Sequence, residues 1–219
     1  MKTVAFVPMK LNNERVPGKN TKKFSNGIPL YRYILNALLN SDGIDEVYVF
    51  CSDIEFSKEM PAGVKYLLRS SELDQNSTKI NEVMLSFANE IKADNYVLAH
   101  ATAPFISSET IKKAVDKVAY EGCDSSMTVH KLQEFIWKDG QPVNYNPSEI
   151  PRTQDLPPYY IETTGLYVYK RDLIVNHNRR IGDNPGLIEV SSIESVDINN
   201  PIDFDIANII SSKVTAPSI

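Results

Sequence analysis

Short apolar runs alternate with amphipathic helical segments as far as residue 119, and this alternation constrains the fold more than any other feature of the sequence. Each apolar run is bounded by turn residues, which is typical of a buried strand. The candidate strands are residues 4–8, 46–50, 64–68 and 96–99, and the candidate helices are residues 30–39, 78–91 (capped by Ser77 or Thr78) and 108–119. Strands separated by such helices predict a mostly parallel sheet covered on both faces. We therefore expect an α/β fold, a single Rossmann-like and doubly wound domain.

The pattern changes after Asp124. A stretch containing proline and asparagine, residues 141–158, is typical of an excursion from the sheet, such as a hairpin, a lid or a dimer arm. The strand-like runs around it are residues 126–129, 135–137 and 159–169, and the later elements are strands at 187–190 and 195–198 and a helix at 204–210. We expect residues 1–219 to form one domain with an inserted β-rich arm at about residues 126–165.

The charge balance and the cysteine count exclude several classes of protein. The 219 residues carry a formal net charge of −5, which lacks the basic excess of a nucleic-acid-binding protein. The two cysteines, Cys51 and Cys123, have no metal-ligand spacing, so a reduced pair is favoured. The apolar run behind Lys2 is too short for a secretory core, and no later run reaches membrane-spanning length. We expect a cytoplasmic protein with no nucleic-acid or membrane partner.

Polar segments follow the predicted strands at the sheet edge where open α/β folds bind their ligands. These segments are residues 9–20, 69–78, 100–104 and 197–205. The first is the densest: its cations, Lys10, Arg15 and Lys19, could neutralise a triphosphate, and Asn12, Asn13 and Gly18 suit a curved loop with inward N–H groups. Its glycine spacing matches neither the P-loop nor the dinucleotide fingerprint. A solvated basic loop is the alternative, but the position after the first strand favours phosphate binding.

Five segments in chain order carry a family pattern. The first loop contributes Arg15, Pro17, Lys19 and Asn20, followed by NGIPL, and the others are residues 68–73, 101–105, 164–167 and 196–199. Together they resemble the CMP-sugar synthetases, the cytidylyltransferases that activate sialic, pseudaminic, legionaminic and octulosonic acids. The chain departs from the pattern at Lys10, where the family usually has Arg, at residues 11–13, which replace a glycine-containing run, and at Asn199, where a second metal-binding Asp is usual.

This resemblance implies a CTP site assisted by Mg²⁺. The nucleotide-binding residues that it implies are Pro8, Lys10, Asn12, Asn13, Arg15, Lys19, Arg69, Thr78, Ala99, His100 and Ala101. The catalytic residues are Lys10, Arg15, Lys19 and Asp197, and Asp197 with Asn199 would ligate the metal through oxygen. His100 stands where sialate enzymes have Gln; a role at the base, a role at the sugar acid and simple burial all remain open. Asp203 and Asp205 are interpreted as helix-start acids.

The resemblance also implies a 2-keto sugar acid as the second substrate. Its anomeric hydroxyl would attack the α-phosphorus of CTP and expel pyrophosphate. The substrate-binding residues expected are Thr102, Arg152, Gln154, Glu162 and Thr164. Because the family's arm crosses to the partner subunit of a homodimer, Arg152 serves either its own site or the neighbouring one. Glu162 replaces an Arg of some sialate enzymes, which argues against ordinary sialic acid. For Trp137, Tyr145, Tyr159 and Tyr160, an interface or core role is favoured over sugar stacking.

The sequence leaves two rival interpretations open. The first is another nucleotidyltransferase, or a nucleotide-sugar glycosyltransferase, of the same architecture. Glycosyltransferases of this shape usually place a D-x-D-like pair after a central strand, where this chain has residues 100–102, so the sequence counts against them. The second is a non-catalytic homologue that binds nucleotide, which Lys10 and Asn199 motivate.

Overall fold

The structure, a computed structural model, describes residues 1–11 and 16–214. Its strands are β1 (Thr3–Met9), β2 (Glu46–Cys51), β3 (Val64–Leu68), β4 (Asn95–Ala99), β5 (Ser125–Leu132), β6 (Trp137–Lys138), β7 (Gln141–Pro142), β8 (Tyr159–Lys170) and β9 (Pro185–Glu189). Its α-helices are α1 (Leu30–Leu39), α2 (Ile80–Glu90), α3 (Ser108–Ala119), α4 (Arg171–Val175) and α5 (Pro201–Ser211), and its 3₁₀ turns are η1 (Lys19–Thr21), η2 (Ile54–Glu59), η3 (Ser71–Asp74) and η4 (Thr153–Asp155). The strands and helices predicted up to residue 119 are confirmed, with ends shifted by at most two residues.

The central sheet has seven strands in the order β3-β2-β1-β4-β8-β5-β9. The pairs β3–β2, β2–β1, β1–β4 and β5–β9 are parallel, whereas β8 runs antiparallel to both of its neighbours. The reason is that β8 returns directly from the excursion that begins at the end of β5, so these two strands pair as a long hairpin would. The predicted mostly parallel sheet is therefore confirmed.

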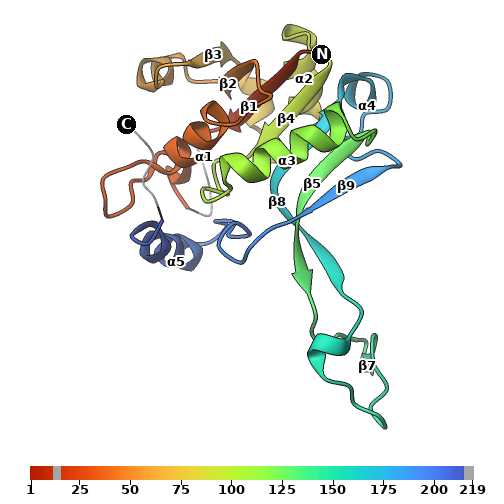
Figure 1. Cartoon of the computed structure of the whole chain (residues 1–219). Helices are drawn as coiled ribbons and strands as arrows, with labels where there is room; N and C mark the ends of the chain where they lie inside the picture. The colour runs from red at the N-terminus through yellow and green to blue at the C-terminus, as the bar shows by residue number, and fades with distance from the viewer. Residues whose placement is uncertain (12–15, 215–219) are drawn as a thin grey trace.

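One helix layer covers each face of the sheet (Figure 1). Neighbouring side chains of β1 point to opposite faces: Val7 packs in the cluster of α1 and α3, and Phe6 in the cluster of α2 and α4. Phe6 and Phe87 of α2 stack with their ring centroids 4.1 Å apart. Burial on both faces explains why the central strands are apolar along their whole length rather than alternating.

A third apolar cluster lies under α5 and contains Phe24, Phe105, Ile198 and Phe204. It fixes the segment before α5 against the loops that follow β1 and β4. The strand predicted at 195–198 is wrong. Ile198 is fully buried in this cluster, and its N–H donates to the carbonyl of Thr102 at 2.9 Å instead of joining a ladder.

Other elements also differ from the prediction. Helix α2 begins at Ile80, and the cap predicted at Ser77 or Thr78 is wrong: the N–H of Lys79 donates to the Glu82 carboxylate at 2.8 Å. The strand predicted at 135–137 is reduced to the short β6–β7 pair, and α4 was not predicted. No helix in the described residues combines the length and apolar character needed to cross a bilayer.

The segment between β5 and β8 projects away from the sheet as a two-stranded ribbon that ends near β6 and β7 (Figure 1). The register of β5 on β8 shifts between Met127 and Val129, and Thr164 has a positive φ of 58° on the facing strand. An irregularity of this kind bends paired strands and re-aims their side chains. Here it separates the part of β8 that pairs with β4 from the part that enters the projecting ribbon.

Candidate active site

A cleft of about 340 Å³ lies at the carboxyl ends of β1, β3 and β4. The residues predicted for nucleotide or substrate binding that line it are Pro8, Lys10, Lys19, Arg69, Thr78, His100, Ala101 and Thr102. It is also lined by Asn20, Leu73, Gln75, Asn76, Ile80 and Val83, which the site prediction omitted although most lie in the polar segments it identified. Asn12, Asn13 and Arg15 lie outside the described residues. Ala99 is fully buried and packs in the core, so it offers only its backbone to a ligand.

Lys19 connects the first loop to the segment before α5. Gly18 adopts a left-handed conformation with φ 61°, which allows the tight η1 turn that carries Lys19. Lys19 is only 9% exposed, and its Nζ donates to the carbonyl of Ile198 at 2.7 Å. A buried ammonium needs oxygen partners to offset its lost hydration. The 19–21 turn and residue 198 are therefore held together at one side of the cleft.

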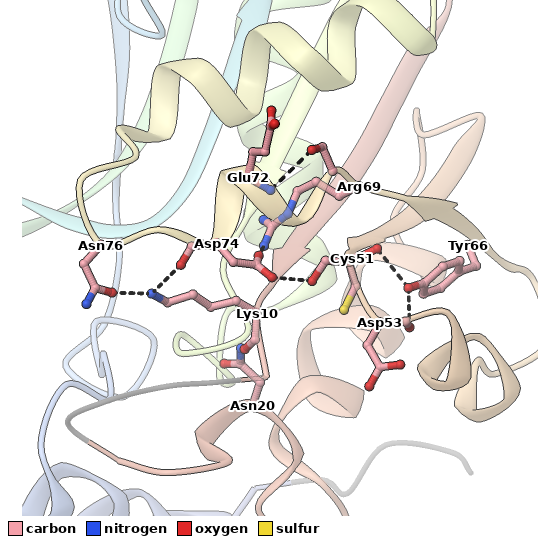
Figure 2. Close-up of polar contacts among 11 residues, drawn as sticks. Lys10, Asn20, Cys51, Asp53, Tyr66, Arg69, Glu72, Asp74 and Asn76 are labelled. Atoms are coloured by element: carbon pink, nitrogen blue, oxygen red, sulfur yellow. Dashed lines mark hydrogen bonds and ion pairs between the residues drawn. The ribbon is translucent and has the colours of Figure 1, made fainter.

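Lys10 and Arg69 are held by a single short loop, which contains Asp74 and Asn76 (Figure 2). Lys10 Nζ donates to Asn76 Oδ1 at 2.8 Å and to the carbonyl of Asp74 at 3.4 Å. Arg69 forms an ion pair with the Asp74 carboxylate, and its Nε is buried with no hydrogen-bond partner among the described residues. Asn20 donates to the carbonyl of Lys10 at 3.1 Å, which fixes the chain as it leaves β1.

His100 lines the same cleft as these cations. Burial lowers the pKa of His100 to about 4, the positive charges of Arg180 and Lys19 act in the same direction, and the Asp197 carboxylate opposes them. The imidazole is therefore neutral near pH 7. Its Nε2 is buried without a hydrogen-bond partner in the part of the chain that the structure describes, and its backbone N–H donates to the carbonyl of Gly165 at 3.0 Å.

A second hollow, of about 320 Å³, lies beside the arm. It is lined by His130, Ile161, Glu162, Thr163, Thr164, Ser195 and Asp197. Asp197 Oδ2 accepts hydrogen bonds from Thr164 Oγ1 at 3.2 Å and from Asn199 Nδ2 at 2.6 Å. Because Ile198 accepts from Lys19 of the first cleft, residues 197 and 198 connect the two hollows. Three predicted residues, Glu162, Thr164 and Asp197, thus share this second hollow.

The acids at the start of α5 have different surroundings. Asp203 accepts from the backbone N–H groups of Asn199 at 2.9 Å and Asn200 at 2.7 Å, which is a helix-capping arrangement. Asp205 is exposed. Within residues 1–11 and 16–214, no group of three or more His, Cys, Asp or Glu side chains is placed to hold a metal ion. Asp197 lines the second hollow, whereas Asp203 caps α5.

Arg180 is a charged residue beside the site that sequence reasoning missed. Its guanidinium lies 3.8 Å from the ring centroid of Tyr167 and donates to the Tyr167 hydroxyl at 3.1 Å. It also lies 3.9 Å from the Glu162 carboxylate, which accepts from the same hydroxyl at 2.7 Å. Arg180 belongs to a polar loop with no motif, so only the folded chain brings it to Glu162.

Arg152 and Gln154 are not brought to either hollow. Both lie at η4 in the projecting ribbon. Arg152 is exposed and makes two hydrogen bonds to Asp155, at 2.8 and 3.1 Å. The carbonyl of Gln154 accepts a hydrogen bond from Gln133 at 3.3 Å. Within residues 1–11 and 16–214 of a single chain, neither side chain lines the two hollows at the sheet edge.

Comparison with known proteins identifies several whose sequences are similar to that of this chain. The chain is 27% identical over 213 residues to the N-acylneuraminate cytidylyltransferase A of Danio rerio, which covers 93% of this chain and 49% of that protein. It is 24% identical over 221 residues to the CMP-N,N'-diacetyllegionaminic acid synthase of Legionella pneumophila, covering 93% of this chain and 94% of that protein. The chain thus spans about half the length of the N-acylneuraminate enzymes that it matches.

Solved structures show the same fold. CMP:2-keto-3-deoxy-manno-octonic acid synthetase, solved with CTP, superposes with a TM-score of 0.74 at 17% identity, over 97% of this chain and 99% of that one. The 4-diphosphocytidyl-2C-methyl-D-erythritol synthase of Anaerococcus prevotii gives 0.69 at 12% identity, over 96% of both chains. The sequence model of the family described as cytidylyltransferase matches residues 4–193, most of the chain. This chain belongs to the cytidylyltransferase family.

Proposed function

We propose that the protein transfers CMP from CTP to the anomeric hydroxyl of a 2-keto sugar acid and releases pyrophosphate. The observation that carries this proposal is the convergence of Lys10, Lys19 and Arg69 on one cleft of about 340 Å³ at the sheet edge where α/β folds bind nucleotides. The names of the relatives, which act on acylneuraminic and legionaminic acids, support the choice of a sugar acid. Residues 1–219 would act as one nucleotidyltransferase domain with an inserted arm.

The cations of the first loop would bind the triphosphate. Lys10 and Lys19 both line the cleft, and Arg15 would add a third charge from the segment between them in the chain. Lys19 is already fixed by the Ile198 carbonyl, so little reorganisation is needed when charge builds up on the transferring phosphoryl group. Fixed charges of this kind stabilise a transition state more effectively than mobile solvent does.

The remaining lining residues would bind the nucleoside. Arg69 offers its buried Nε–H to a base or ribose oxygen, and Thr78 and the backbone near Ala99 and Ala101 would border the ring. The neutral His100 would present Nε2 as one more hydrogen-bonding atom, toward either the ribose or the acceptor. A purely structural role for His100 is less favoured, because a buried polar atom without a partner costs stability unless a ligand satisfies it.

The donor set suits one Mg²⁺ ion held mainly by the nucleotide. Asp197 supplies a hard carboxylate ligand, and Asn199 presents its amide nitrogen, rather than its oxygen, to that carboxylate. Asn199 would have to turn its amide to become a ligand, so Asp197 is the principal protein contact that we propose. When bound, Mg²⁺ would share the negative charge of the phosphate oxygens.

The second hollow would receive the sugar acid. Glu162, Thr164 and Asp197 line it, and Thr102 lies at the adjoining edge of the cleft. Arg180 is the nearby cation through which the acceptor carboxylate could be attracted, with Glu162 restricting its position. Proximity of the two substrates across residues 197 and 198 would account for much of the catalysis.

We also propose that the arm joins two copies into a homodimer. Large apolar side chains are exposed along it, including Trp137, Ile150, Tyr160 and Ile161. Such side chains are enriched at protein interfaces. In a dimer, Arg152 and Gln154 would reach the partner's site, which would explain why they contact no hollow of their own chain. Sedimentation equilibrium should give twice the chain mass, and a monomer at micromolar concentration would contradict this assembly.

Pyrophosphate release measured with CTP, UTP, GTP or ATP and a panel of 2-keto sugar acids tests the proposed reaction. We expect turnover with CTP and at least one acid, and none in the Asp197→Ala variant, while Asp205→Ala, which removes an exposed acid from the same region, keeps full activity. Selective use of UTP would indicate the rival transferases. Binding of CTP without turnover on any acid would indicate the non-catalytic homologue.

A further inference from the structure

Asp74 contacts two cations of the cleft, Lys10 and Arg69 (Figure 2). It is not itself among the residues that line the cleft. It is the last residue of η3. Its carboxylate pairs with Arg69 through one oxygen and accepts from Ser52 Oγ through the other, while its backbone carbonyl accepts from Lys10 Nζ. A residue in this position can act on a bound nucleotide only through its neighbours.

Arg69 depends on Asp74 for charge compensation. The Arg69 side chain is 4% exposed, and the Asp74 carboxylate is the acidic group that pairs with it within the described residues. A guanidinium removed from water requires such a partner, because the planar fork loses most of its hydration. The ion pair occupies Nη2, and the Nε–H is left as a buried donor without a described partner. The orientation of that donor is therefore set by Asp74.

The Asp74 carboxylate is itself fixed from the neighbouring strand. Ser52 follows directly after β2, and its hydroxyl holds the second carboxylate oxygen. The backbone N–H of Arg69 donates to the carbonyl of Cys51 at 2.9 Å, so the ends of β2 and β3 are joined at the same point. Lys10 is tied to this loop by Asn76 at 2.8 Å as well as by Asp74. Residues 70–76 thus hold in one arrangement the cation that follows β1, Lys10, and the cation that follows β3, Arg69.

We propose that Asp74 is a positioning residue for nucleotide binding: its carboxylate aims the Arg69 Nε–H at an oxygen of the bound nucleoside. This inference rests on the proposed function, since the ligand of the cleft is taken to be a nucleoside triphosphate. Because Arg69 contacts the ground-state nucleotide, loss of Asp74 weakens CTP binding more than it slows the chemical step. Its effect also requires Arg69 to be present.

The test measures CTP affinity by calorimetry, together with kcat and KM, in Asp74→Asn and Glu72→Gln. Glu72→Gln is the matched control, because it removes the same charge from the same turn. In Figure 2 the Glu72 carboxylate points away from the Arg69 guanidinium. We expect Asp74→Asn to raise Kd and KM for CTP about tenfold, the scale of one lost charge-assisted hydrogen bond, with kcat within about threefold. Glu72→Gln should match the parent. An equal loss in both variants would overturn the proposal, because it would reflect net charge alone.

A double-mutant cycle with Arg69→Met separates positioning from a general structural effect. If Asp74 acts through Arg69, Asp74→Asn adds no further loss of CTP affinity in the Arg69→Met background. Independent, additive losses would overturn the proposal. Should Asp74→Asn fold poorly in a thermal-melt check, Ser52→Ala is the milder variant, for which we expect a smaller rise in KM in the same direction; an unchanged KM there would count against the proposal.

A ligand-free measurement keeps the inference separable from the proposed function. The Nε–Hε resonance of Arg69, assigned by its loss in Arg69→Met, should be protected from solvent exchange in the parent and in Glu72→Gln and should lose that protection in Asp74→Asn. If the parent protein binds no nucleotide at all, the proposed function fails while this spectrum still decides whether Asp74 orients Arg69. Unchanged protection in Asp74→Asn would overturn the positioning role.

Discussion

Replacing Gly165 with Ala is expected to destabilise the protein because the new methyl group has no space. A Cβ at this position of β8 would lie 2.6 Å from the Cβ of Ala103 and 2.7 Å from Cδ1 of Ile106. Both neighbours are 1% exposed, and the Ala103 methyl cannot rotate away because it is attached directly to the backbone. The nearest contact is roughly 1 Å shorter than an ordinary carbon–carbon contact, so the strand or the 100–106 loop must move.

The magnitude follows from overpacking of a close-packed interior. Forcing one extra methyl group into such a core costs about 1–3 kcal/mol. For a domain of this size, a loss of about 2 kcal/mol lowers the melting temperature by roughly 4–8 °C. The His100 N–H bonds to the carbonyl of Gly165, so the same displacement should also reach the site and lower kcat/KM.

Urea unfolding of Gly165→Ala, Ala103→Gly and the double variant measures this contact. Ala103→Gly alone should cost about 1 kcal/mol through added backbone freedom. The double variant should be more stable than the sum of the two single losses predicts, because the shortest clash has been removed. A Gly165→Ala protein as stable as the parent, or strictly additive losses in the cycle, would refute the packing argument.

Further predictions concern titration and the second hollow. Unfolded His100 gains its proton near the ordinary pKa of 6.5 and folded His100 near 4, so stability should fall as the pH drops between these values, and His100→Gln should flatten that part of a urea-unfolding series across pH. Glu194 is partly desolvated, but hydrogen bonds from Thr110 and Ser107 outweigh this and lower its pKa. The stability it contributes is therefore present above its ordinary value of 4.5 and lost as the pH falls below it; Glu194→Gln should lose about 1 kcal/mol at pH 7, and an unchanged unfolding midpoint would contradict this. Arg180→Met should raise KM for the sugar acid while leaving the calorimetric Kd for CTP unchanged; an equal loss for both ligands would show that Arg180 is not specific to the acceptor side.

The sheet could be predicted because its strands are buried on both faces and therefore stand out as apolar runs. The strand predicted at 195–198 failed for a different reason: Val196 and Ile198 alternate with polar residues as a half-buried strand would, yet Ile198 packs in the cluster under α5. Its backbone is satisfied by Thr102. The local sequence pattern cannot distinguish an apolar residue that belongs to a strand from one whose side chain packs in a cluster formed by distant loops.

The first cleft was predictable and the second was only partly so. Lys10, Lys19 and Arg69 follow strands directly, and parallel topology alone brings strand ends to one edge. Asp74 and Arg180 act through contacts with side chains that no motif connects to them. Arg152 carried a family signal but lies in the projecting ribbon, where its partner is Asp155.

Strand β8 runs without a break from the central sheet into the projecting ribbon, and this limits where the ribbon can be shortened. The middle of this strand contacts the active-site cleft, where the carbonyl of Gly165 accepts from the His100 N–H, and its first residues form one strand of the projecting ribbon, paired as far as Leu132 with Tyr159. His130 of β5 and Ile161 of β8 line the second hollow. They pair with each other on the sheet side of that last pair. A shortened arm should therefore be closed between residues 133 and 158, which keeps the last strand pair, because a cut that reaches residues 130 and 161 removes part of the lining of the second hollow together with the arm.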